Sequence, residues 1–305
     1  MAKYRCEGSR RKHSDGTPYC SYEADARWLG PCPGCSRYYS ISVPRPEPDL
    51  TKMTLATLAN IKPPERLSTG CKEMDYVVGG GIVPGSTLVL TGPPGQGKTT
   101  CLLQAANAVA LTTGKPVLYT SGEQNADDVG LFAARLKIEN PNIHIRGNEG
   151  DCYKITAEAE RMKPALIVVD SAQTAFISDV GGDVGSSEQL KAITNWLTSF
   201  GKVEKVAIII VMHVTKDNEL SGPRAVEHLV DTVCYLEPYE PQDDELSDDE
   251  DGAPQRLDEL YLKSLREFNI GKNRFGPPGR SGVVEMSERG IITPTKLVSS
   301  RIILA

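Results

Sequence analysis

The sequence predicts an α/β fold built on a mostly parallel central sheet, preceded by a small module that contains several cysteines. Three observations predict this fold. Five short runs are apolar throughout and rich in β-branched residues, as strands buried on both faces of a parallel sheet are. Segments with helical patterns separate several of these runs, as crossover connections between parallel strands require. A glycine-rich turn joins the first run to the first helical segment.

The first expected strand, residues 86–92 ("STLVLTG"), runs directly into the glycine-rich turn, and an expected helix follows at 98–113. The second strand, 116–122 ("PVLYTSG"), is followed by a helical segment at 125–137. Strand, turn and helix in this order are the context of a nucleotide-binding loop.

The third expected strand, residues 165–171 ("ALIVVDS"), contains an acid near its end, and a helical segment follows at 187–201. The fourth strand, 206–214 ("VAIIIVMHV"), contains a histidine near its end, and the fifth is 232–237 ("TVCYLE"). Polar side chains at the carboxyl ends of parallel strands gather at one edge of the sheet, where ligands bind.

Length and composition describe a globular protein. The chain has 305 residues, of which 39% are hydrophobic and 24% charged. No run approaches the roughly 18 apolar residues that a membrane span needs, and no signal-peptide pattern begins the chain. We therefore expect a cytoplasmic protein with no membrane partner. In that compartment the eight cysteines are metal ligands or buried thiols rather than disulfides.

The net charge of −6 comes from one segment. Residues 237–251 hold nine acids and no base, and the rest of the chain carries about +3. We expect a disordered acidic insertion at 237–256. The alternative is a mimic of nucleic acid that competes for a basic channel.

The chain divides into unequal parts. Residues 1–42 form the expected cysteine-containing module, and 43–64 form a linker that contains the proline-rich "VPRPEPD". Residues 65–295 form the expected nucleotide-binding domain, and 296–305 form a tail.

The segment "GPPGQGKT" at 92–99 matches the phosphate-binding motif G-x-x-x-x-G-K-[ST]. Its glycines let backbone N–H groups surround phosphates at a helix N-terminus. Lys98 is expected to reach the β- and γ-phosphates of ATP, and the Thr99 hydroxyl to coordinate Mg²⁺. The predicted nucleotide contacts are Gly92, Pro93, Pro94, Gly95, Gln96, Gly97, Lys98, Thr99, Thr100 and Asp170.

Three residues that end strands complete the predicted catalytic edge. Asp170 ends "ALIVVD" and is expected to hold Mg²⁺, through water; its alternative role is a helix cap. Glu123 in "LYTSGEQ" is the predicted base that orients the attacking water, although an exposed glutamate opening a helix is possible. His213 ends "VAIIIVMH", where it can sense the γ-phosphate or serve a structural role.

The ordered motifs "LYTSGEQ", "IVVDSAQT", "HVTK", "GPRAVEHLVDTVCYLE" and "KNRFG", together with the P-loop, resemble the bacterial RadA/Sms recombination proteins over roughly residues 1–290. The resemblance implies a RecA-like P-loop ATPase core and a small N-terminal zinc ribbon. It also implies a homo-hexameric, DnaB-like helicase that hydrolyses ATP on single-stranded DNA. Such a motor extends strand-exchange intermediates in homologous recombination and DNA repair, with a RecA-type recombinase as a possible partner.

The segment "GKNRFGPPG" at 271–279 contains too many helix and strand breakers for a helix interior or a central strand. In RecA-type rings a neighbouring subunit completes each ATP site, so the resemblance implies that Lys272 and Arg274 reach the neighbour's γ-phosphate. Phe275 would pack this loop in place. The alternative is a solvated basic turn.

The resemblance also implies DNA-binding loops at 177–187 and 215–224. Lys216 and Arg224, with Lys272, are the predicted phosphate contacts. The first loop has two aspartates and no base, so any contact there must come from backbone N–H groups.

The pair "CPGC" at 32–35 resembles half of a zinc ribbon. The predicted Zn²⁺ ligands are Cys6, Cys20, Cys32 and Cys35. Thirteen residues separate the first two where the family has two, so His13 as a replacement ligand and loss of the metal both stay open. Cys71, Cys101, Cys152 and Cys234 are expected to be buried thiols.

Only about fifteen residues follow "VVEMSERG", so we expect a short form that lacks the Lon protease-like domain of the family. Besides the motor, a non-motor ATPase switch or loader that recruits a recombinase or helicase through its zinc module fits the same motifs. A metabolic P-loop kinase is disfavoured, because it needs neither a zinc ribbon nor paired basic residues near the C-terminus.

Overall fold

The computed structural model describes residues 4–6, 20, 22–24, 41–42, 64–213, 226–241 and 259–295. The chain divides into two compact units, Met1–Pro63 and Pro64–Ala305. The predictions that fall outside the described residues concern His13, Cys32, Cys35, Lys216, Arg224, residues 43–63 of the linker, most of the acidic tract and the tail.

The first unit contains a small antiparallel sheet. Its strands are β1 (Tyr4–Cys6), β2 (Glu23–Ala24) and β3 (Ile41–Ser42), in the order β2-β1-β3. Cys6 and Cys20 are both buried and form one small cluster, against which Tyr22 packs.

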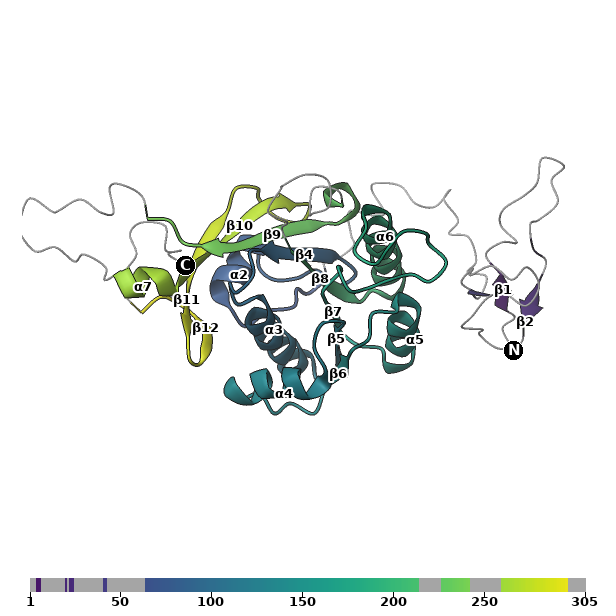
Figure 1. Ribbon diagram of the computed structural model, residues 1–305, viewed down its shortest axis with the longest axis horizontal. Coiled ribbons are helices and arrows are strands. Elements are labelled where there is room, and N and C mark those ends of the chain that lie inside the picture. The colour runs from purple at the N-terminus through teal and green to yellow at the C-terminus, as the bar shows by residue number, and fades with distance from the viewer. Residues whose placement is uncertain are drawn as a thin grey trace, which may run out of the picture. The chain divides into compact units, whose positions relative to one another are not determined.

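The second unit is built on a nine-stranded sheet with the order β12-β11-β10-β9-β4-β8-β7-β5-β6 (Figure 1). The parallel strands are β4 (Thr87–Gly92), β5 (Val117–Ser121), β6 (Ile143–Gly147), β7 (Leu166–Asp170), β8 (Ala207–His213) and β9 (Thr232–Pro238). The antiparallel strands are β10 (Leu265–Asn273), β11 (Ser281–Ser287) and β12 (Gly290–Ile292). The predicted α/β fold with a mostly parallel sheet is confirmed.

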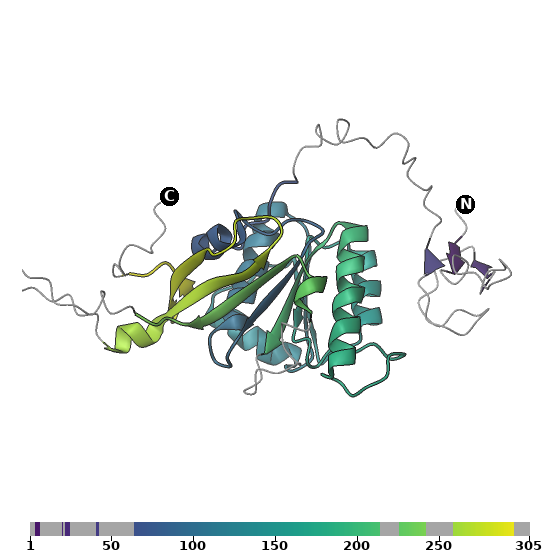
Figure 2. The same cartoon turned by 90° about the horizontal axis from the view of Figure 1, so that it is seen from above.

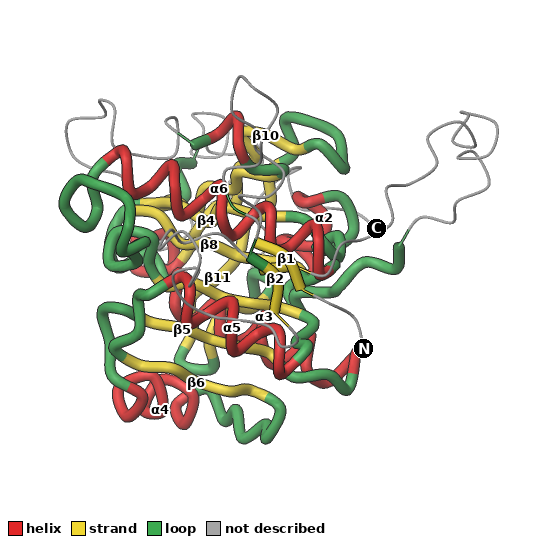
Figure 3. The backbone as a smooth tube through the Cα atoms, turned by 90° about the vertical axis from the view of Figure 1, so that its right-hand side faces the viewer, coloured by secondary structure: helices red, strands yellow, loops and turns green. Residues whose placement is uncertain are grey.

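Helices cover both faces of this sheet (Figures 1 and 2). Side chains from α2 (Lys72–Val78), α3 (Lys98–Thr113) and α4 (Ala126–Arg135) join the buried cluster on one face. Those from α5 (Cys152–Met162) and α6 (Ser187–Glu204) join the cluster on the other, and in Figure 3 these two helices lie in front of the strands. Two short helices, η4 (Glu227–Leu229) and α7 (Glu259–Ser264), precede β9 and β10. No helix in the described part of the chain is long and apolar enough to cross a membrane.

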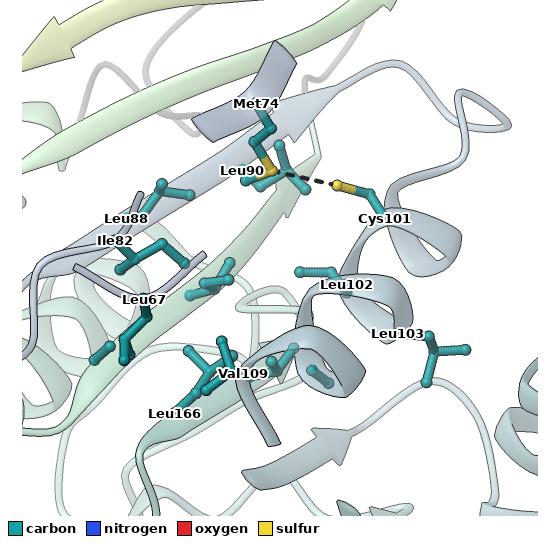
Figure 4. Close-up of a cluster of buried hydrophobic side chains, with 14 of the residues drawn as sticks. Leu67, Met74, Ile82, Leu88, Leu90, Cys101, Leu102, Leu103, Val109 and Leu166 are labelled. Atoms are coloured by element: carbon teal, nitrogen blue, oxygen red, sulfur yellow. Dashed lines mark hydrogen bonds between the residues drawn. The ribbon is translucent and has the colours of Figure 1, made fainter. Parts of the chain in front are cut away.

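The alternation of side chains along β4 explains why this strand is apolar throughout. Leu88 and Leu90 belong to one buried cluster and Val89 belongs to the other, so successive side chains pack on opposite faces. Figure 4 shows Leu88 near Ile82 and Leu90 near Met74, within the cluster that also contains Leu102 of α3. In the same cluster the Cys101 thiol donates to the Met74 sulfur at 3.5 Å. This core fixes the strand that leads into the P-loop.

Two of the three expected helices, α4 and α6, begin after residues whose side chains cap them. The Asn125 side chain accepts a hydrogen bond from the N–H of Asp128 at the start of α4, and the Ser186 side chain accepts one from the N–H of Gln189 at the start of α6. Each cap satisfies a backbone donor that the helix itself leaves unpaired.

One local expectation was wrong in part. The beginning of "GKNRFGPPG" lies in β10, which pairs with β9 on one side and β11 on the other. The β9 pairing shifts register between Ile270 and Lys272, so Gly271 is accommodated as an irregularity and the strand continues to Asn273. Only the part that follows Asn273 connects β10 to β11 as a loop.

Candidate nucleotide-binding and catalytic site

The P-loop joins the carboxyl end of β4 to the first turn of α3. Gly95 and Gly97 have φ angles of +75° and +91°, which glycine adopts without the steric cost that other residues carry. At Gly92 (φ +146°) a Cβ atom would lie 2.0 Å from the carbonyl oxygen of Leu236. The loop therefore begins where β4 passes closely against β9, and only glycine fits there.

Lys98 is folded back onto this loop. Its Nζ donates hydrogen bonds to the carbonyl oxygens of Gly92 and Pro93, both at 2.8 Å. Burial lowers the pKa of Lys98, while the carboxylates of Asp170 and Glu123 act in the opposite direction. A buried ammonium at the first turn of a helix is suited to a phosphate, because the helix N-terminus and the lysine attract the same anion.

The other polar side chains of the loop have local partners. The Gln96 amide donates to the carbonyl of Pro94 at 3.3 Å. The Thr100 hydroxyl accepts from Arg135 of α4 at 3.2 Å.

A carboxylate and a hydroxyl meet beside the P-loop. The Thr99 Oγ1 donates to Asp170 Oδ2 at 3.2 Å, and the buried phenol of Tyr119 donates to the same oxygen at 2.8 Å. Burial raises the pKa of Asp170, while the hydrogen bond from Tyr119 opposes this effect. Carboxylate and hydroxyl oxygens are ligands that Mg²⁺ prefers, so Thr99 and Asp170 fit this ion.

Glu123 is held by two neighbours at the same edge of the sheet. The Ser171 hydroxyl donates to Glu123 Oε1 at 2.5 Å, and His213 Nε2 lies 3.3 Å from the same oxygen. The three residues follow or end β5, β7 and β8, which are adjacent in the sheet. The side chain of Glu123 is 43% exposed, so water can reach its carboxylate.

The structure therefore brings together Lys98, Thr99, Glu123, Asp170 and His213, all expected from the sequence. Sequence reasoning missed Tyr119 and Ser171. Both lie within the motifs that carry the neighbouring acids, "LYTSGEQ" and "IVVDSAQT". The pairing of β5 with β7 brings Tyr119 to Asp170 and Ser171 to Glu123, and the spacing of residues in the sequence does not show these contacts.

Lys272 and Arg274 lie near the amino ends of the parallel strands, at the opposite end of the sheet from the P-loop. Asn273 of β10 pairs with Thr232, which pairs with Leu88 near the start of β4. From Leu88 to Gly92 a strand rises about 13 Å. The predicted basic pair is therefore remote from the P-loop of its own chain.

Both basic side chains contact the segment that precedes β9. Lys272 Nζ donates to the carbonyl of Glu227 at 2.6 Å. Arg274 Nη1 lies 3.2 Å from Asp231 Oδ1, and the Arg274 side chain is 46% exposed.

The main chain of Phe275 makes two hydrogen bonds that hold the "KNRFG" loop. Phe275 is 42% exposed. Its N–H donates to Asn273 Oδ1 at 3.0 Å, and its carbonyl accepts from Arg66 Nη2 at 2.5 Å.

Two of the four predicted zinc ligands, Cys6 and Cys20, are described and lie in one buried cluster. Within the described residues, no group of three or more potential metal-binding side chains is present. Cys101, Cys152 and Cys234 are buried, and Cys71 is partly buried. Burial raises the pKa of Cys71 and of Cys152 to about 12, so these two residues are neutral thiols, as expected.

Comparison with known proteins agrees with this geometry. Residues 60–219 match a family model described as an AAA domain. The DNA repair protein RadA of Listeria monocytogenes is 34% identical over 285 residues, which cover 90% of this chain and 57% of that protein. RadA of Aquifex aeolicus is 34% identical over 281 residues, covering 89% and 57%. The chain thus spans somewhat more than half of these relatives' length, and the predicted resemblance to RadA is confirmed.

Two solved structures share the fold. A KaiC-like protein from Pyrococcus horikoshii superposes with a TM-score of 0.56 at 19% identity, covering 75% of this chain and 99% of that one. The RadB recombinase superposes with a TM-score of 0.51 at 19% identity, covering 74% and 98%. With a RecA-like α/β core, a P-loop flanked by Asp170 and Glu123, and a family match over more than half of its length, the chain belongs to the AAA domain family.

Proposed function

We propose that this protein is an ATP-dependent motor on single-stranded DNA that acts in homologous recombination and DNA repair. It works as a homo-hexameric ring whose ATP sites lie between subunits, and it drives branch migration of strand-exchange intermediates as a helicase. The relatives named DNA repair protein RadA support the biological setting. One observation supports the mechanism most directly: the P-loop lies at the carboxyl end of β4, and the "KNRFG" loop lies near the amino end of the same strand.

The first half of the ATP site is the edge that holds Lys98, Glu123 and Asp170. Lys98 and the N-terminus of α3 bind the phosphates, and Glu123 orients the attacking water and accepts its proton. Ser171 and His213 fix the Glu123 carboxylate in place. Magnesium, bound by Thr99 and Asp170, would neutralise charge on the phosphate oxygens.

The second half of the site comes from a neighbouring subunit. Negative charge moves among the phosphoryl oxygens during transfer, and a cation supplied from another subunit typically accelerates such reactions by roughly 10³- to 10⁵-fold. Lys272 and Arg274 are remote from their own P-loop, and the Arg274 side chain is 46% exposed. A second copy that presents its P-loop edge to this loop completes the site.

DNA binding and partner recognition belong to other parts of the chain. Lys216, Arg224 and Lys272 are the proposed phosphate contacts with DNA. The first unit, with Cys6, Cys20, Cys32 and Cys35 as Zn²⁺ ligands, is the proposed contact for a RecA-type recombinase.

The test is steady-state ATP hydrolysis with and without single-stranded DNA at two salt concentrations, for the wild type and Lys272→Ala. We expect DNA to stimulate the rate, salt to reduce the stimulation, and the variant to lose most of its turnover. Lys263→Ala is the matched control, because Lys263 is an exposed lysine paired with Glu259 on α7. Wild-type turnover in Lys272→Ala would refute the shared site.

The second candidate is a partner-controlled ATPase switch or loader. This candidate would be favoured if single-stranded DNA did not change the rate of ATP hydrolysis but Lys272→Ala lowered it. The shared ATP site would then hydrolyse ATP without bound DNA.

A further inference from the structure

Asp231 is a buried carboxylate at the start of β9. Its side chain is 3% exposed. One oxygen, Oδ2, accepts the N–H of Thr87 at 3.1 Å, and the other, Oδ1, lies 3.2 Å from Arg274 Nη1. Burying an ionised carboxylate is costly unless it is paired and hydrogen-bonded. Asp231 therefore constrains the two groups that satisfy it.

These two groups belong to different parts of the proposed machinery. Thr87 is the first residue of β4, the strand that ends at the P-loop. Arg274 belongs to the loop that follows β10, and its own N–H donates to the Asp231 carbonyl at 3.0 Å. Asp231 thus holds both the backbone and the guanidinium of Arg274 against the first residue of the P-loop strand.

The contact with Asp231 leaves most N–H donors of the Arg274 guanidinium available. It has five N–H donors in a planar fork, and in the described structure Asp231 is its side-chain partner through Nη1. With the side chain 46% exposed, the outer donors remain free for a phosphate. Because Asp231 already restrains the guanidinium, Arg274 loses less conformational entropy on binding an anion than an unrestrained arginine does.

We infer that Asp231 is the residue that positions Arg274 for the neighbouring subunit's ATP. Asp231 is a positioning residue, which acts on the ATP site through Arg274. This inference rests on the proposed shared site. It adds that the orientation of the guanidinium, and not only its charge, sets the rate.

The test is a double-mutant cycle on DNA-stimulated ATP hydrolysis, with Asp231→Asn, Arg274→Ala and the double variant. Asn retains an acceptor for the Thr87 N–H but loses the charge that holds Arg274. We expect Asp231→Asn to lower kcat by roughly 10- to 100-fold, with KM for ATP nearly unchanged. Because Asp231 acts through Arg274, the double variant should be no slower than Arg274→Ala.

The matched control is Glu204→Gln, which removes the charge of a carboxylate paired with Lys163 at 2.9 Å at the ends of α5 and α6. It should hydrolyse ATP at the wild-type rate. Wild-type kcat in Asp231→Asn, or a double variant slower than Arg274→Ala by the full factor of Asp231→Asn, would overturn the inference while leaving the shared site intact. Wild-type kcat in Arg274→Ala would remove Arg274 from the shared site, and the inference would fall with it.

Should Asp231→Asn fail to fold, Arg274→Lys gives the same answer. A lysine keeps the charge, but it lacks the rigid planar fork in which one donor of the guanidinium is fixed by Asp231 while the outer donors are oriented toward a phosphate. We expect a kcat close to that of Arg274→Ala, and wild-type kcat in Arg274→Lys would overturn the inference.

Discussion

Residues that follow or end two other strands, Ser171 and His213, hold the Glu123 carboxylate in position. The proposed role of Glu123 as the base can therefore be tested separately from nucleotide binding. Ser171 and His213 both contact Glu123 Oε1, whereas Lys98 and Thr99 contact the P-loop and Asp170. Glu123→Gln should lower kcat by roughly 10²- to 10⁴-fold and leave the affinity for a fluorescent ATP analogue unchanged.

The matched control is Glu158→Gln, which removes the charge of a carboxylate paired with Arg146 at 2.6 Å. It should be active. A Glu123→Gln variant that hydrolyses ATP normally would assign the base to another residue.

The burial of Asp170, the proposed Mg²⁺ ligand, has a consequence for stability. Burial raises its pKa, so its ionised form is disfavoured in the folded protein without metal. The stability lost by ionising Asp170 grows as pH rises from the ordinary carboxyl pKa to this raised pKa, is complete above the raised pKa, and is absent below the ordinary one. Asp170→Asn keeps an acceptor for Tyr119 and Thr99 while removing the charge.

Thermal unfolding in EDTA without nucleotide should therefore give a higher Tm for Asp170→Asn than for the wild type at pH 7. The difference should shrink as pH falls toward the ordinary carboxyl pKa. The same variant should lose Mg²⁺-dependent nucleotide binding. A lower Tm for the variant at pH 7 would contradict this account of Asp170.

At the scale of elements, the close approach of β4 to β9 makes Gly92 harder to replace than Gly114, a glycine at the far end of α3. A Cβ at Gly92 would meet the Leu236 carbonyl at 2.0 Å, whereas one at Gly114, the last residue capping α3, would meet nothing within 4 Å. Both have positive φ. Gly114→Ala should cost about 1–2 kcal/mol in unfolding free energy.

Gly92→Ala should cost at least about 3 kcal/mol, because the strands must also move apart. Chemical denaturation of both variants gives the comparison. Equal destabilisation would mean that β4 and β9 separate easily.

The elements that the sequence predicts are those whose burial is uniform. Every residue of β4, β5 and β7 is buried, and their apolar runs predict them directly. By contrast, β6 alternates between intermediate and exposed residues at the sheet edge, and β10 is interrupted by polar residues and by the irregularity at Gly271. Patterns of this kind do not stand out from those of loops.

The catalytic edge was predictable for the same reason that the sheet was. Glu123, Asp170 and His213 follow or end buried parallel strands, and the carboxyl ends of such strands meet. Tyr119, Ser171 and Asp231 were not predictable, since each acts on a residue more than forty positions away and only the strand pairing reveals the contact.

At the scale of the whole molecule, the first unit depends on metal in our account. It buries Cys6 and Cys20 together, and such small modules rarely fold without a metal or other covalent link. The purified chain should hold one Zn²⁺, and Cys20→Ser should release it, as measured by metal analysis. Cys152→Ser, in a buried thiol of α5, should keep the zinc. Metal-free wild-type protein would remove zinc from the account.

The shared ATP site is the central claim, and subunit complementation tests it most directly. Lys98→Ala destroys the P-loop half of the site and Lys272→Ala the half contributed to a neighbour, so each variant alone should be nearly inactive. In co-assembled mixtures, some interfaces combine an intact P-loop from one variant with an intact "KNRFG" loop from the other. We predict that ATP hydrolysis by the co-assembled mixture clearly exceeds the sum of the two variants measured separately. A mixture no more active than that sum would contradict a site completed by the neighbouring subunit.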